Sequence, residues 1–184
     1  TERPLGQDEP YVFTTGSAFR DYDTFFKAVD RLGYRTLVLS GTRALAGLDV
    51  PTNVEILEQI PRPEIRRLVR HARVNVLPLS PEAATAGLVT IVEAFRHGRS
   101  LVATRRPGLD DYFIENETVL CADLHDVTGL AEAIERMWSD DDERARLDRG
   151  ATEFGLTHCT DEAAAGHLVR VLDEVAPGVS ADAR

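Results

Sequence analysis

The chain has 184 residues, 43% of them hydrophobic, and a formal net charge of -10 at pH 7. Its length suits one domain with a single core, and its acidic balance argues against a general nucleic-acid binder or a protein of anionic membrane surfaces. No apolar run approaches the roughly 20 residues that span a bilayer. The first residues lack a signal-peptide pattern, and two cysteines without CxxC spacing form no disulfide framework. We therefore expect a reduced, cytoplasmic protein.

Short apolar runs alternate along the chain with longer segments of helical periodicity. Runs of β-branched and aromatic residues predict buried strands, and apolar residues spaced three and four apart predict amphipathic helices. The strands are expected at residues 11–15, 36–40, 54–57, 74–79, 100–103 and 118–122. The helices are expected at 21–32, 63–72, 88–97, 126–138, 141–154 and 160–175, with one further helical turn at 110–115 and a loop at 42–53.

This alternation predicts an α/β fold, namely a doubly wound, Rossmann-like, six-stranded parallel sheet with helices on both faces. We expect residues 1–9 to be a linker or tail, 10–158 the Rossmann-like domain and 159–184 a C-terminal helix and tail. In a doubly wound sheet of order 3-2-1-4-5-6, the first and fourth strands are neighbours, and ligands bind beyond their carboxyl ends. Arg20 follows the first strand and Gly87 follows the fourth, so topology alone should bring both to one crevice.

The segment around Gly87 has the features of an anion site. A buried strand leads into a loop of small residues and then into a helix, whose first turn has unpaired N–H groups and a partial positive charge. Gly87 lets the backbone approach a ligand closely. Glu93 lies on the line Gly87, Thr90, Glu93, and helical side chains lean toward the N-terminus, so its carboxylate should overlie the first turn. An anion site beside an acceptor for a vicinal diol predicts binding of a nucleoside diphosphate.

Four segments carry a resemblance to a known family. They are the loop 15–22, the strand 74–80, the helix and following strand 87–104, and the turn 107–112, and together they cover about residues 10–155. These segments resemble the C-terminal, donor-binding half of the GT-B-fold retaining glycosyltransferases, the group that includes the glycogen-synthase-like and sucrose-synthase-like enzymes. The most specific of them is 87–104. The resemblance implies the donor-binding half of an enzyme that transfers a sugar from a nucleotide-diphosphate sugar to an unidentified acceptor.

The family pattern implies a role for individual residues. The N–H groups of Leu88 and Val89 would hold the pyrophosphate, and Glu93 would bind the ribose hydroxyls. Arg20 would be the catalytic cation that offsets charge on the leaving nucleoside diphosphate, which is where such an enzyme lowers its barrier. The base would lie near residues 60–62. The other residues expected near the donor are Gly16, Ile60, Arg62, Glu82, Thr85, Gly87 and Thr90. The nucleotide-sugar is the substrate, and no cofactor or metal is expected.

The sequence departs from the family pattern in three ways. The family usually has a second glutamate eight positions before Glu93, where this chain has Thr85. A second basic residue often lies closer to the first strand, where this chain has Thr15, Gly16 and Ser17. The N-terminal acceptor-binding half is absent from this sequence. We expect that half in cis or as a separate chain, and we expect the isolated chain, which starts at Thr1 rather than Met, to be inactive alone.

Two alternative functions fit the same residues. The nucleotide-sugar 2-epimerases have a similar C-terminal half, and a domain with these departures can instead be a non-catalytic docking or regulatory module. The helix predicted at 63–72 is basic, which favours a solvated face and leaves docking to an acidic partner or to the missing half as the alternative. Its basic residues and those beside it are Arg62, Arg66, Arg67, Arg70, His71 and Arg73. The five histidines have no metal-ligand spacing, so no metal site is predicted.

Overall fold

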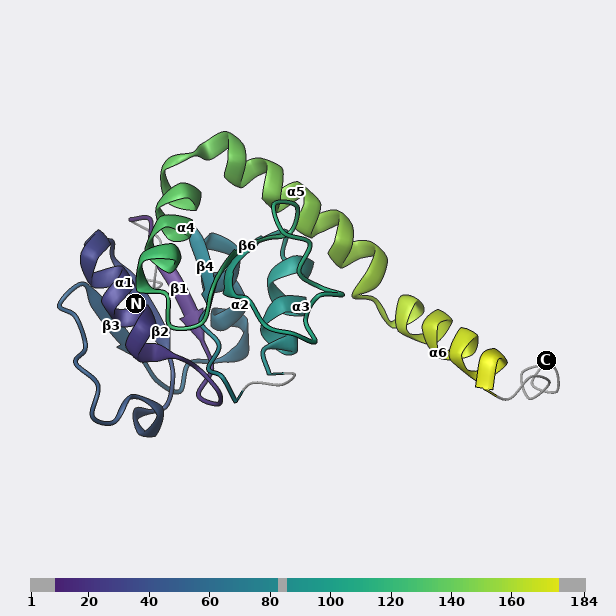
Figure 1. Cartoon of the computed structure of the whole chain (residues 1–184), viewed down its shortest axis with the longest axis horizontal. Coiled ribbons are helices and arrows are strands. Elements are labelled where there is room, and N and C mark those ends of the chain that lie inside the picture. Colours follow the sequence, from purple (N-terminus) through teal and green to yellow (C-terminus); the bar gives the residue numbers. More distant parts are fainter. Residues whose placement is uncertain (1–8, 83–85, 176–184) are drawn as a thin grey trace.

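The computed structural model describes residues 9–82 and 86–175. At its centre lies a six-stranded sheet of order β3-β2-β1-β4-β5-β6 in which each strand pairing is parallel (Figure 1). The strands are β1 (Val12–Thr15), β2 (Thr36–Leu39), β3 (Val54–Leu57), β4 (Val74–Leu77), β5 (Leu101–Thr104) and β6 (Val119–Ala122). The predicted α/β class and doubly wound strand order are confirmed.

Helices cover both faces of the sheet. They are α1 (Tyr22–Leu32), α2 (Arg62–His71), α3 (Leu88–Arg96), α4 (Val127–Ser139), α5 (Asp141–His158) and α6 (Asp161–Val175), with a 3-10 helix η1 (Thr42–Leu45). Side chains of α2 and α3 belong to one core cluster and those of α1 and α4 to a second, each together with strand side chains, and α5 contributes to both. Consecutive strand residues alternate between the clusters, as Val12 and Phe13 do, because successive side chains of a strand point to opposite faces.

Two segments differ locally from the prediction. Where one helical turn was predicted at 110–115, the amides of Tyr112 and Phe113 both donate to the Leu109 carbonyl at 2.9 Å, which makes a turn that starts earlier. Burial of the Leu109 side chain anchors this turn in the core. The predicted loop 42–53 begins with η1, whose entry is held by the Gly41 amide donating to Ser17 Oγ at 3.0 Å. Both differences come from contacts that the local pattern does not contain.

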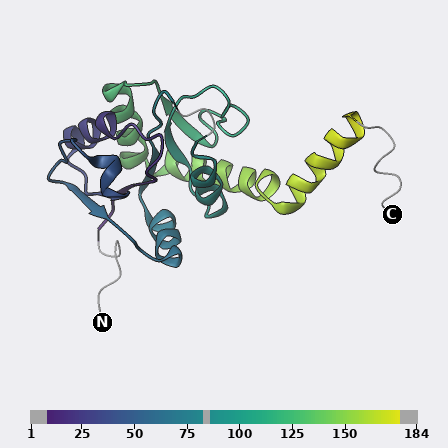
Figure 2. The ribbon, with the colours of Figure 1, turned by 90° about the horizontal axis from the view of Figure 1, so that it is seen from below.

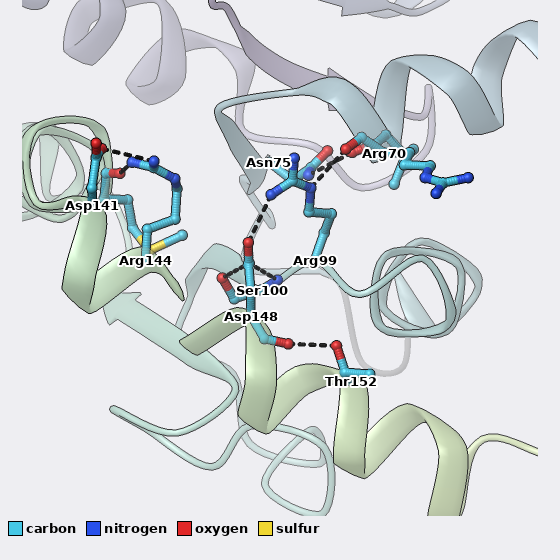
Figure 3. A network of polar contacts seen from close by, with 10 residues as sticks. Arg70, Asn75, Arg99, Ser100, Asp141, Arg144, Asp148 and Thr152 are labelled. Carbon is cyan, nitrogen blue, oxygen red and sulfur yellow. Dashed lines mark hydrogen bonds and ion pairs between the residues drawn. The ribbon is translucent and has the colours of Figure 1, made fainter. Parts of the chain in front are cut away.

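A polar network joins α5 to the start of β5, at the edge of the sheet opposite the carboxyl ends of the strands (Figure 3). The Asp148 carboxylate accepts from the amide and hydroxyl of Ser100 at 2.8 and 2.7 Å and from Arg99 Nη1 at 2.7 Å. Arg99 Nε also donates to the Arg70 carbonyl at 2.7 Å, which links the end of α2 to the same network. The network joins α5 and the end of α2 to the start of β5.

Helix α6 extends away from the sheet in both views of the ribbon (Figures 1 and 2). None of its residues is buried, and its apolar side chains include the exposed Leu168, Val169 and Leu172. Among the described helices, none combines the length and apolar character that a bilayer crossing requires. The predicted division of the chain at residues 9 and 158 stays a prediction.

Tyr11 is expected to make the free energy of unfolding fall at alkaline pH. Its buried hydroxyl donates to the Leu68 carbonyl at 2.9 Å, and burial raises the pKa of Tyr11 to about 12. This pKa in the folded state exceeds the pKa of about 10 in the unfolded state. The Tyr11 hydroxyl therefore contributes its full share to the free energy of unfolding below about pH 10, and that share is lost as the pH rises toward the pKa of the folded state. We expect Tyr11→Phe to cost about 1 kcal/mol at neutral pH and to reduce the alkaline loss, measured as urea midpoints at about pH 8 and 11. An equal alkaline loss in both proteins would contradict this assignment.

Candidate functional site

The loops after β1 and β4 are joined by their backbones. Arg20 and Leu79 form an antiparallel bridge, the Asp21 amide donates to the Pro78 carbonyl at 3.0 Å, and the Ser80 amide donates to the Phe19 carbonyl at 3.1 Å. Both loops leave the carboxyl ends of neighbouring parallel strands, so they meet at the same edge of the sheet. The structure therefore brings the two loops together where the topology predicted a crevice.

The Arg20 side chain is fixed across this crevice. Its Nε donates to the Thr15 carbonyl at 3.1 Å, Nη1 to the Ala18 carbonyl at 3.0 Å, and Nη2 to Thr90 Oγ1 on α3 at 3.3 Å. The guanidinium lies over Gly16, where a Cβ would come within 2.6 Å of Nη2 and φ is 116°. Burial lowers the pKa of Arg20 from its usual value, but a guanidinium stays protonated in proteins. A fixed positive charge thus stands beside the first turn of α3.

The start of α3 has a glycine as its N-cap. Gly87 has φ 97° and offers no side chain to accept a hydrogen bond from the first N–H groups of the helix. A Cβ at Gly87 would lie 3.0 Å from a methyl group of Leu77, so a larger residue would push the helix start away from β4. Val89 is 83% exposed. The first N–H groups of α3 are positioned for an anion, because the partial positive charge of a helix N-terminus favours one there.

A cavity of about 270 Å³ lies between α2 and α3. Glu93 contributes to it from α3, together with Thr90, the partner of Arg20. The Glu93 carboxylate accepts from Arg66 Nε at 3.0 Å and lies 3.3 Å from His97 Nε2. The cavity is lined by Thr15, Arg62, Ile65, Arg66, Val69, Val89, Thr90 and Glu93. The Glu93 side chain thus lines this cavity while 32% of it stays exposed, and Arg66 of α2 contacts its carboxylate from the side.

The sequence profile of a family described as "Glycosyl transferases group 1" matches residues 9–140, which includes every residue of this site. The chain belongs to this family. The predicted membership in the glycosyltransferases is therefore confirmed, and the C-terminal, GT-B-like identity agrees with the solved structures that this fold resembles. A comparison with curated proteins finds no match.

The fold of this member of the family is similar to several solved structures. A glycosyltransferase from Rickettsia africae has a TM-score of 0.73 and 14% identity, and the match covers 93% of this chain and 49% of that one. HepE from Anabaena in complex with UDP-glucose has a TM-score of 0.72 and 14% identity, and the match covers 90% of this chain and 49% of that one. Sucrose-phosphate synthase from Thermosynechococcus elongatus has a TM-score of 0.69 and 22% identity, and the match covers 92% of this chain and 47% of that one. This chain spans about half the length of these proteins.

The other residues predicted for the donor lie in different surroundings. Ile60 packs partly buried against the core, and Arg62 lines the cavity between α2 and α3. Glu82 is exposed at the rim of the loop after β4, where a hydrogen bond from the Ser80 hydroxyl lowers the pKa of Glu82. Thr85 lies outside the described residues. The structure therefore brings Arg62 to the same cavity as Glu93.

A second cavity of about 360 Å³ lies at the carboxyl ends of β1, β2 and β3, on the other side of Thr15. Hydroxyl groups dominate its polar wall, and Ser17 Oγ lies 3.3 Å from Ser40 Oγ across it. Its lining is Thr15, Gly16, Ser17, Leu39, Ser40, Gly41, Thr42, Glu58 and Gln59. Gly16 thus separates this cavity from the guanidinium of Arg20.

Several arginines of the basic helix α2, and Arg73 beside it, already have partners within the chain. Arg66 pairs with Glu93, Arg67 pairs with Glu64, and Arg73 donates to the Trp138 carbonyl at 2.7 Å and pairs with Asp141. Arg66 is not among the residues predicted for the site, although its position four residues after Arg62 on one helix puts both on the same face. In the described ranges, no three histidine, cysteine or acidic side chains are grouped to hold a metal ion.

Proposed function

We propose that this chain is the donor-binding half of a glycosyltransferase and that it binds a nucleoside-diphosphate sugar. The glycine-capped start of α3, with Val89 exposed in its first turn and Arg20 fixed on Thr90 beside it, is the observation that carries this proposal. The diphosphate binds the N–H groups of Leu88 and Val89, and the ribose lies against Glu93. The base occupies the region of residues 60–62. Family membership and neighbours solved with UDP-glucose support the same assignment.

The chemical role of Arg20 follows from where charge develops. When the bond between the sugar and the diphosphate breaks, negative charge grows on the departing phosphate oxygen. A cation already fixed in place stabilises that charge without reorganising during the reaction. Arg20 is held by three hydrogen bonds, which gives it this property. Retention of configuration is proposed on the resemblance of the sequence alone.

A second half of the protein is proposed to bind the acceptor. The solved relatives are about twice as long as this chain, and we propose that an N-terminal acceptor-binding half, in cis or as a separate chain, closes over the crevice. We also propose that the protein is cytoplasmic and that its cysteines are reduced. Cys121 and Cys159 are free thiols, which agrees with a reducing compartment. Burial raises the pKa of Cys121 to about 11, so that thiol is protonated at neutral pH.

Calorimetric titration with UDP, GDP and ADP tests donor binding. We expect one of them to bind, and we expect Glu93→Ala to weaken that binding by about tenfold or more, because hydrogen bonds to a charged group contribute about 1.5–3 kcal/mol. Glu132→Ala, an exposed glutamate on α4, is the matched control and should bind as the unchanged chain does. Absence of binding by all three nucleotides at millimolar concentration, or an unaffected Glu93→Ala variant, would count against the proposal.

A further inference from the structure

We infer that Arg66 and His97 are positioning residues that hold one carboxylate oxygen of Glu93 and leave the other for the ribose hydroxyls. Both contacts go to Oε1, from Arg66 Nε at 3.0 Å and from His97 Nε2 at 3.3 Å. Within residues 9–82 and 86–175, Oε2 makes no hydrogen bond that would compete with a ligand. This inference rests on the proposed function and assigns two residues that recognise the ribose only through Glu93.

The helix that carries Arg66 is anchored to the sheet. This helix, α2, is fixed to the sheet by two buried side-chain hydrogen bonds, from Tyr11 Oη to the Leu68 carbonyl at 2.9 Å and from Asn75 Nδ2 to the Val69 carbonyl at 3.0 Å. Leu68 and Val69 themselves are buried in the core beneath the helix. A guanidinium that starts from this fixed turn reaches Glu93 from a defined direction, although 58% of the Arg66 side chain is exposed.

His97 holds the same oxygen from within α3. It is the C-cap residue, and its amide donates to the Glu93 carbonyl at 3.2 Å. Because an ionised carboxylate can only accept hydrogen bonds, the His97 nitrogen that faces it, Nε2, carries the proton. The carboxylate is therefore held by one residue one turn away on its own helix and by another across the cavity.

The two hydrogen-bond partners of Oε1, Arg66 and His97, restrict the rotamer of Glu93 before a ligand binds. A group that is already oriented loses less conformational freedom on binding, so a greater part of the hydrogen-bond energy appears as affinity. The difference in binding free energy between a ribonucleotide and its 2′-deoxy form should then depend on Arg66. If Arg66 instead competed with the ribose for Glu93, its removal would strengthen ribonucleotide binding.

The experiment measures discrimination between sugars rather than affinity alone. The full chain is titrated with the nucleoside diphosphate that binds it among UDP, GDP and ADP, and with the 2′-deoxy form of the same nucleotide. We expect the unchanged chain to prefer the ribonucleotide by about tenfold. Arg66→Ala and His97→Ala should each reduce this preference, and the double variant should reduce it to about threefold or less. Arg66→Lys should restore part of it, because a cation at that position still attracts the carboxylate.

Arg70→Ala is the matched control, since Arg70 is an exposed arginine one turn further along α2 that makes no side-chain contact with Glu93. Thermal unfolding without ligand verifies that every variant folds. Unchanged discrimination in Arg66→Ala, or tighter ribonucleotide binding by it, would overturn this inference while leaving the proposed function in place. If the unchanged chain binds no nucleoside diphosphate, the proposed function fails and this inference fails with it.

Discussion

Replacing Arg20 by alanine is expected to weaken binding of the nucleoside diphosphate by about a hundredfold, because a charge-assisted contact to phosphate contributes up to about 3 kcal/mol. Arg20 Nη2 already lies 3.3 Å from Thr90 Oγ1, on the first turn of α3 where the phosphates are proposed to bind. The substitution removes both the charge and three hydrogen bonds that fix it. Calorimetry with the same nucleotides measures the effect.

The control for Arg20→Ala is Arg35→Ala. Arg35 lies at the amino end of β2, at the opposite edge of the sheet, and it pairs with Glu55 at 3.3 Å near the surface. Its removal should leave nucleotide affinity unchanged. Arg20→Lys keeps the charge without the planar fork and should bind with intermediate affinity. Binding by Arg20→Ala that equals binding by the unchanged chain would remove Arg20 from the proposed mechanism.

The largest expected effect on stability comes from Asp148. Its side chain is 17% exposed, and its carboxylate accepts from Arg99 and from both the amide and the hydroxyl of Ser100. Asp148→Ala leaves the buried Ser100 N–H and the charge of Arg99 without this partner, which should cost about 2–4 kcal/mol in the free energy of unfolding. A shift of the urea midpoint measures the loss.

Glu153→Ala serves as the comparison on the same helix. Glu153 is exposed on α5, and its replacement should change the free energy of unfolding by no more than about 0.5 kcal/mol. Asp148→Asn retains one acceptor oxygen and should fall between the two. Equal midpoints for Asp148→Ala and Glu153→Ala would show that the network in Figure 3 contributes little to stability.

Much of the site could be predicted from the sequence because it depends on local patterns and on one topological rule. Strand β1, Gly16 and Arg20 follow one another directly, and strand β4 leads through a short loop to Gly87 and α3. Once the alternation of strands and helices indicates a parallel sheet, the carboxyl ends of neighbouring strands must lie at one edge. The meeting of Arg20 with Thr90, 70 residues apart, follows from that rule.

The partners of Glu93 could not be predicted in the same way. Helical spacing placed Glu93 in line with Thr90, but it gave no information about the neighbouring helix. Arg66, 27 residues before Glu93, was interpreted as part of a solvated face. Its contact with Glu93 depends on how closely α2 and α3 pack, which is set by buried side chains such as Leu68 and Ile91 rather than by the spacing of charges.

The sequence by itself determined the order of strands and helices, the parallel sheet and the position of the candidate site at the start of α3, because each arises from spacing along the chain or from the handedness of connections. Only the tertiary structure decided which side chains surround that site and which carboxylates act as anchors. Asp148 and Glu93 are both acidic residues on helices, yet one joins α5 to the sheet and the other borders a cavity. That difference arises from the packing of whole helices, which no short segment of sequence encodes.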